Sequence, residues 1–114
     1  MESHNISINR KARYNYEILE TYEAGLVLTG TEIKSIRSGN ANMADAYAHA
    51  DGGELWLRNL HIAHYAASSS NHHPTRTRKL LLRRSQIIEL THNIGARGLT
   101  VVPLKLYLKN GIKE

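Results

Sequence analysis

The sequence predicts a mainly β protein with short α-helices, whose strands curl into a small antiparallel barrel. Apolar and polar residues alternate in several short runs of the 114-residue chain, which is the pattern of half-buried strands. Turn residues separate these runs, and one run is interrupted at Gly25, where a strand bends most easily. The chain lacks the regular alternation of strands with long helices that marks a parallel sheet. These observations favour an antiparallel barrel with two brief helices.

The first part of the chain predicts one strand and one helix. Alternation over residues 14–28 predicts a long strand that bends at Gly25. Thr29 is followed three residues later by Glu32, which is the capping-box pattern of a helix start. Apolar residues then recur at helical spacing, so we expect a short helix over residues 31–38.

The middle of the chain predicts a β-hairpin. An Asp-Gly-Gly turn at residues 51–53 lies between two alternating runs, 46–50 and 54–58, and Asp-Gly in this position is a strong hairpin signal. The alternation slips at residues 58–60. We therefore expect a bulge before Ile62.

The second part of the chain predicts a loop, a helix and a strand. Serine, asparagine and proline predict a surface loop over residues 66–75. Residues 99–108 predict a strand, with Pro103 at an edge or a bulge. Ser85 is the expected cap of the second helix, whose apolar stripe consists of Ile87, Ile88, Leu90 and Ile94.

The two ends of the chain carry further predictions. Asn110-Gly111 is a favoured hairpin turn, but only three residues follow it, so the returning strand of the barrel is missing. An unpaired barrel edge exposes backbone donors and acceptors, and we expect this chain to be a C-terminally shortened piece of a longer protein. Residues 1–8 are expected to be a flexible segment before a single domain over residues 9–114.

Charge is divided unequally along the chain. The formal net charge is +5, but residues 1–54 carry five basic and eight acidic side chains, whereas residues 55–114 carry ten basic and two acidic side chains. A stretch this poor in carboxylates keeps a positive surface potential, which suits a polyanion such as nucleic acid. A solvated basic face without a specific partner explains the charge equally well.

Composition argues against several classes of protein. The chain has no cysteine, which excludes disulfides and thiolate metal sites and favours a cytoplasmic protein. No apolar run approaches the roughly 20 residues needed to cross a bilayer, and the N-terminus lacks the order of a signal peptide. We therefore expect neither secretion nor contact with a membrane.

The sequence also offers no convincing active site or metal site. His61 and His64 are three residues apart in an expected strand and face opposite sides, and adjacent His72 and His73 cannot easily direct both rings at one ion. We find no glycine-flanked nucleophilic serine, no glycine-rich phosphate loop and no suitably spaced pair of carboxylates. We expect a protein that is not an enzyme and that needs no metal and no cofactor.

A first group of residues that suits RNA lies near the N-terminus. Arg10, Lys11 and Arg13 stand beside Tyr14, so cations for phosphate contact adjoin a ring on which a base or ribose can pack. A basic N-terminal tail with no partner is the alternative interpretation.

Two further basic groups follow along the chain. Lys34 and Arg37 lie on the first predicted helix, where they are either RNA contacts or solvated cations. Arg76, Arg78 and Lys79 form the second group. In an extended chain Arg76 and Arg78 point the same way, about 7 Å apart, which matches a phosphate backbone.

Four blocks of sequence together resemble one family. In order they are NRKAR at 9–13, YEAGL at 22–26, GTEIKSIR at 30–37 and PTRTRKLLL at 74–82. Their order and separation closely resemble the SsrA-binding protein family, also called small protein B, and the match runs from about Asn9 to Asn110. A generic oligonucleotide-binding-fold translation or ribosomal RNA-binding protein fits the charge equally well, but it does not account for the four ordered blocks.

The resemblance implies a bacterial-type cytoplasmic protein that binds the tRNA-like domain of transfer-messenger RNA (tmRNA, SsrA). It implies an oligonucleotide-binding-like barrel with accessory helices, and no catalytic activity. The complex enters ribosomes stalled on messages without a stop codon and contacts the small subunit, so that trans-translation rescues the ribosome. Alanyl-tRNA synthetase and elongation factor Tu are implied partners only through the RNA, and the protein is expected to be monomeric.

The resemblance also implies a set of RNA-binding residues and two departures from the family pattern. Glu23 is an unusual member of the set, but a carboxylate accepts hydrogen bonds from a 2′-hydroxyl or a base amino group. Tyr14 stands where many members have histidine. The family continues past Glu114 with another strand and a basic tail, so the resemblance implies RNA binding without support for peptide tagging. The expected RNA-binding residues are Asn9, Lys11, Arg13, Tyr14, Glu23, Lys34, Arg37, Arg76, Arg78, Lys79 and Leu81.

Overall fold

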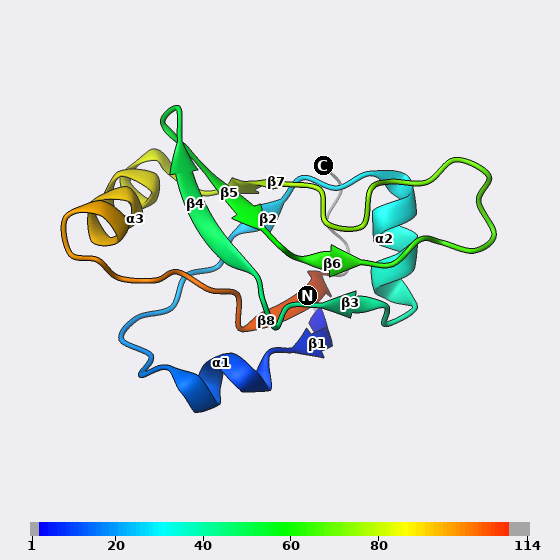
Figure 1. Cartoon of the computed structure of the whole chain (residues 1–114), viewed down its shortest axis with the longest axis horizontal. Helices are drawn as coiled ribbons and strands as arrows, with labels where there is room; N and C mark the ends of the chain where they lie inside the picture. Colours follow the sequence, from blue (N-terminus) through cyan, green and yellow to red (C-terminus); the bar gives the residue numbers. More distant parts are fainter. Residues whose placement is uncertain (1–2, 110–114) are drawn as a thin grey trace.

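The computed structural model describes residues 3–109, which form a mainly β fold with short helices, as the sequence predicts (Figure 1). The elements in chain order are β1 (Ser3–Ile8), α1 (Arg10–Asn15), β2 (Gly25–Leu26), α2 (Gly30–Arg37), β3 (Ala41–Asn42), β4 (Tyr47–Asp51), β5 (Glu54–Arg58), β6 (His61–Ile62), β7 (Arg78–Leu81), α3 (Arg84–Gly95) and β8 (Lys105–Lys109).

The strands pair in three antiparallel sheets. The largest has the order β2-β7-β5-β4, and the other two are the pairs β3-β6 and β1-β8. Over residues 3–109 no continuous ladder of hydrogen bonds joins the three sheets into a closed barrel. The turn predicted at Asn110-Gly111 lies outside the described residues, and so does the expectation about the strand that would follow it.

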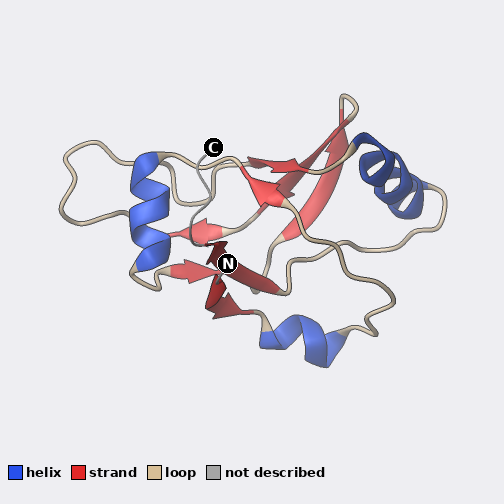
Figure 2. Ribbon diagram, turned by 180° about the vertical axis from the view of Figure 1, so that it is seen from behind, coloured by secondary structure: helices blue, strands red, loops and turns tan. Residues whose placement is uncertain are grey.

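The core has two parts, because α2 and α3 lie at opposite ends of the strands (Figures 1 and 2). Strand β5 contributes buried residues to both parts, and Leu80 of β7 packs against both. None of the helices within residues 3–109 has the length and apolar character needed to span a membrane. The buried residues are Ile36, Met43, Ala46, Leu57, Leu60 and Ile62 on the α2 side, and Leu55, Ile87 and Leu90 on the α3 side.

The predicted hairpin is confirmed by β4 and β5, in which Asp51 pairs with Glu54. The two turn residues, Gly52 and Gly53, have φ of 62° and 79°, which is the left-handed region that a type I′ turn needs. After β5 the extended conformation is interrupted at Asn59, which has φ of 63°, and β6 then begins. Asparagine tolerates this conformation better than most residues. The expected irregularity before Ile62 is therefore a change of strand.

The strand predicted over residues 14–28 is wrong. Its first residues belong to α1, and within that range only Gly25 and Leu26 are in a strand. The Asn9 side chain caps α1, because its Oδ1 accepts a hydrogen bond from the Ala12 backbone N–H at 3.2 Å. This local cap outweighs the period-two spacing of the tyrosines, which suggested a strand.

The helix predicted from Ser85 is present as α3, but its start and its buried face differ from the prediction. The helix begins after Arg83, whose backbone N–H donates to Oε1 of Gln86 at 3.0 Å, so Ser85 is not the cap. Ile88 is 61% exposed and lies outside the buried stripe. The stripe that packs on the core consists of Ile87, Leu90 and the partly buried Ile94, at positions i, i+3 and i+7, and Ile88 lies beside it on the side turned to solvent.

Both ends of the described chain also differ from expectation. The segment over residues 1–8, predicted to be flexible, contains strand β1, which pairs with β8. The strand predicted from residue 99 begins only at Lys105. Before it the chain is held to β4 by the Ala48 backbone N–H, which donates to the Val101 carbonyl at 2.8 Å.

We predict that Leu90→Ala lowers the free energy of unfolding by about 2 to 5 kcal/mol, because it leaves a cavity under α3. Ile88→Ala removes a similar side chain from the exposed face of the same helix and should change stability by about 0.5 kcal/mol or less. Urea unfolding of both variants measures the difference. Equal losses would contradict the position of α3 on the core.

Candidate RNA-binding surface

The carboxylate of Glu32 joins two arginines to the start of α2. Glu32 is the third residue of α2 and completes the capping box that begins at Thr29, and its Oε1 accepts a hydrogen bond from the Thr29 backbone N–H at 2.8 Å. Arg76 donates to both carboxylate oxygens, from Nη2 at 2.6 Å and from Nε at 3.1 Å. Arg78 donates from Nε to Oε2 at 2.6 Å. The capping residue of α2 therefore also ties this helix to β7 and the segment before it.

Arg78 is an internal residue of this structure. Its side chain is 0% exposed, and its Nη1 and Nη2 donate to the carbonyls of Leu60 at 2.7 Å and Pro74 at 3.1 Å. The sequence prediction placed the two guanidiniums side by side on a phosphate backbone. Instead both bind one carboxylate, and only Arg76 keeps part of its side chain at the surface, 36% exposed.

The arginines determine the protonation of Glu32. Burial by itself raises the pKa of this carboxyl, but hydrogen bonds from Arg76, from the Thr29 backbone and from Arg78 outweigh that effect and lower the pKa to about 2. Burial lowers the pKa of Arg78, while Glu32 acts in the opposite direction. The group is therefore a buried carboxylate held in its charged form.

The loop over residues 66–75 is confirmed as irregular, but one of its histidines is buried. His72 is 8% exposed, and its Nε2 donates to the Ile62 carbonyl at 2.8 Å. Its Nδ1 lies 2.8 Å from the Thr31 hydroxyl, at the start of α2. The ring thus anchors the loop. Within residues 3–109 no group of three or more histidine or acidic side chains is placed to hold a metal ion.

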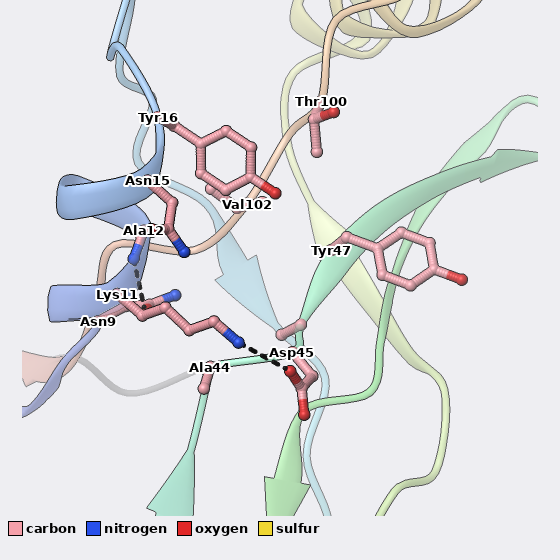
Figure 3. Close-up of a pocket in the computed structure, with 11 residues that line it drawn as sticks. Asn9, Lys11, Ala12, Asn15, Tyr16, Ala44, Asp45, Tyr47, Thr100 and Val102 are labelled. Carbon is pink, nitrogen blue, oxygen red and sulfur yellow. Dashed lines mark hydrogen bonds and ion pairs between the residues drawn. The ribbon is translucent and has the colours of Figure 1, made fainter.

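Helix α1 presents exposed cations around an exposed ring. Arg10 and Arg13 are exposed, and Tyr14 is 92% exposed. Lys11 lies 3.5 Å from Asp45 in an exposed ion pair (Figure 3). Asn9 is different, because it is 5% exposed and its Nδ2 donates to two backbone carbonyls, those of Met43 and Pro103. Asn9 therefore positions α1 and is not part of its surface.

A second surface is an open groove of about 530 Å³ at the end of β7. It brings together two predicted residues, Glu23 and Leu81, although they are far apart in the sequence. The Glu23 carboxylate accepts a hydrogen bond from the Tyr107 hydroxyl. Leu81 is 51% exposed. The groove is completed by Leu82, Arg83 and Gln86.

The remaining predicted residues lie apart from these two surfaces. The ammonium group of Lys34, on α2, lies 5.7 Å from the centre of the Tyr65 ring, a cation–π distance. Arg37 is exposed at the end of the same helix. Lys79 lies 3.7 Å from Glu54 across the β5-β7 pair.

Comparison with known proteins places the chain in a family. The sequence profile of the SmpB protein family matches residues 6–113. The chain belongs to the SmpB family. The SsrA-binding protein of Nostoc punctiforme is 57% identical over 108 residues, which are 93% of this chain and 70% of that protein. The SsrA-binding protein of Mycolicibacterium smegmatis is 56% identical over 107 residues, 93% of this chain and 66% of its own length.

A solved structure agrees with the SmpB assignment. It is described as "tmRNA-SmpB: a journey to the center of the bacterial ribosome", and the matching chain has a TM-score of 0.76 and 48% sequence identity. The match covers 91% of this chain and 73% of that chain. The family inferred from four blocks of sequence is therefore confirmed, and the chain shares its overall fold with that solved chain.

Some residues of these surfaces were missed by the sequence analysis. Arg83 was left outside the site, although it lines the groove with Glu23 and Leu81. Arg83 directly follows the block at 74–82 and precedes α3, and this position in the sequence was the signal available. Tyr16 and Asn15 adjoin the basic block 9–13, but the incorrect strand assignment hid their position at the end of α1.

We predict that Glu32→Gln lowers the free energy of unfolding at pH 7 by about 3 to 5 kcal/mol, because Arg78 stays buried without its carboxylate. The folded-state pKa of Glu32 lies below its ordinary value of 4.5. The stabilisation is therefore complete above about pH 5 and is lost as the pH falls toward 2. Urea unfolding should show nearly the same difference between Glu32→Gln and wild type at pH 7 and pH 5, and a clearly smaller difference at pH 3.

The exposed carboxylate of Glu17 gives a matched control, since Glu17→Gln makes the same chemical change on the surface. This variant should stay close to wild type at all three pH values. A Glu32→Gln deficit that is the same at pH 7 and pH 3 would contradict a stabilising carboxylate at this position.

Proposed function

We propose that this chain binds the tRNA-like domain of transfer-messenger RNA and supports its delivery to stalled ribosomes, where trans-translation rescues them. Membership of the SmpB family supports this, as do relatives named SsrA-binding protein and a similar chain described with tmRNA and the bacterial ribosome. The observation in the structure that carries the proposal is the surface of α1, where cations surround a fully accessible aromatic ring.

The surface of α1 has the chemistry that structured RNA requires. Arg10 and Lys11 precede Tyr14 by four and three residues, so the three side chains share one face of the helix. Cations contact phosphates, and an exposed ring stacks on an unpaired base. The Tyr14 side chain is 92% exposed, so its ring is accessible for such stacking.

The groove at the end of β7 supplies a second contact in this proposal. Glu23 accepts hydrogen bonds from a ribose 2′-hydroxyl or a base amino group, which distinguishes RNA from DNA. Arg83 provides a positive charge beside it, and Leu81 provides an apolar surface for a sugar or a base edge. Arg76, Lys34, Arg37 and Lys79 lie apart from these two surfaces, and in this proposal they add to the positive potential of the protein as a whole.

In the proposed function Asn9 and Arg78 are positioning residues. Asn9 holds α1 against the chain near Met43 and Pro103. Arg78 holds the segment that carries Arg76. Loss of either side chain should reduce RNA binding through a change of structure, without removal of a direct contact.

The rest of the proposal concerns partners and setting. The protein acts in the cytoplasm as a monomer and performs no catalytic step of its own. Alanyl-tRNA synthetase and elongation factor Tu act on the same RNA, and they meet this protein only through it.

We predict that Arg10→Ala together with Arg13→Ala weakens binding to the tRNA-like domain and flattens its salt dependence. Each lost phosphate contact should reduce the slope of log K against log salt by about 0.7 to 0.9. Binding measured at several salt concentrations gives both quantities. Arg97→Ala, an exposed arginine after α3, is the matched control and should leave the slope unchanged.

Competition with ordinary tRNA tests the specificity of the proposal. Transfer-messenger RNA should be bound more tightly than tRNA at every salt concentration. Equal affinity for all structured RNA would favour the generic translation protein instead, and no binding to either RNA would contradict the proposed function altogether.

A further inference from the structure

A cleft of about 300 Å³ lies between the end of α1, the segment before β4 and the extended chain before β8. Figure 3 shows the Tyr16 ring and the Asn15 side chain on one side of the cleft and the paired Lys11 and Asp45 on the other. Its size lies at the lower end of the range for small-ligand pockets. The cleft is lined by Asn9, Lys11, Ala12, Asn15, Tyr16, Ala44, Asp45, Ala46, Tyr47, Thr100 and Val102.

The end of α1 directs an aromatic ring over this cleft. The helix ends at Asn15, and Tyr16 is extended, with φ of −127° and ψ of 144°. Its ring therefore leaves the surface of the helix and lines the cleft, as Val102 also does (Figure 3). The residue is 48% exposed, so one part of the ring remains accessible. By contrast, Tyr14 lies on the outer surface of the same helix.

Polar groups in the cleft are available for hydrogen bonding. Within residues 3–109 the Asn15 amide and the Thr100 hydroxyl make no hydrogen bond. A side-chain amide offers donors and an acceptor in one plane, and a hydroxyl offers both. The negative charge of Asp45 is balanced by Lys11 at 3.5 Å. The cleft thus combines an aromatic face with a planar hydrogen-bonding edge and no unbalanced acid.

We infer that this cleft binds a single unpaired nucleobase of RNA, with Tyr16 as the stacking ring and Asn15 as the group that contacts the base edge. This inference rests on the proposed function and specifies a subsite of it. A nucleobase has two features that match the lining, namely a flat π-face and an edge with donors and acceptors. The phosphates on either side of the base lie near the exposed cations of α1.

Other ligand classes fit the cleft less well. A free phosphate needs several cations, but Lys11 is the one cation in the lining and it is already paired. A divalent cation needs several oxygen ligands, and Asp45 is the one carboxylate there. An unpaired base is neutral and flat, so it requires neither.

Substitutions at Tyr16 test the inference. Tyr16→Ala should weaken binding to the tRNA-like domain or to small ribosomal subunits by roughly 5- to 150-fold, the range of one base-stacking contact. Tyr16→Phe keeps the ring and should stay within about 2-fold of wild type. The salt slope should be unchanged in both variants, since no phosphate contact is lost. Thermal unfolding of Tyr16→Ala checks that the variant is folded at the assay temperature.

Abasic RNA identifies the base and its source. A set of transfer-messenger RNA fragments is prepared, each with one abasic nucleotide at an unpaired position. One of these fragments should bind the wild-type protein as weakly as intact RNA binds Tyr16→Ala. Binding of that fragment should not be weakened further by Tyr16→Ala. If Tyr16→Ala weakens binding to small ribosomal subunits but not to transfer-messenger RNA, the base belongs to ribosomal RNA. If folded Tyr16→Ala binds both as well as wild type does, the inference is overturned. If wild type binds neither, the proposed function fails as well.

Discussion

The buried carboxylate of Glu32 is the interaction on which the rest of this structure depends. It completes the cap of α2, and it accepts hydrogen bonds from two arginines that are 44 and 46 residues away in the sequence. An unpaired charge at 0% exposure would be destabilising by several kcal/mol. The helix, the entry to β7 and the break after β5 must therefore form together, because Arg78 also donates to the Leu60 carbonyl.

The hydrogen bonds to Glu32 determine which of these cations are accessible for contact with RNA. Arg78 is buried and donates to Glu32, and Arg76 donates to the same carboxylate from two of its nitrogens. Exposed cations lie instead at other places, which include Arg10 and Arg13 of α1 and Arg83 beside the groove. The cap that Asn9 provides keeps α1 helical and so holds its arginines and Tyr14 at the surface. The internal polar residues thus act on binding by determining where exposed residues lie.

Local features were predictable from the sequence, and long-range partners were not. The capping box at Thr29 and the hairpin turn at Gly52 depend on residues a few positions apart, and both predictions are confirmed. The four sequence blocks also identified the family. The burial of Arg78 depends on Glu32, which no local pattern connects to it. The strand predicted from Tyr14 failed because period-two spacing over a few residues cannot outweigh a helix cap.

Net charge along the chain is a poor guide to the surface of this protein. The first 54 residues carry more acidic than basic side chains, but Glu32 is buried with two arginines, Asp45 pairs with Lys11, and Glu54 lies beside Lys79. The exposed arginines of α1 therefore belong to the half with the negative net charge. In the basic half, Arg78 is buried, and the side chain of Arg84 donates to the Gly53 carbonyl. RNA affinity should accordingly depend on the cations that stay exposed in either half, such as Arg10 and Arg13 on α1 and Arg83 beside the groove, and not on the net charge of a segment, because a phosphate responds to the charge it can approach.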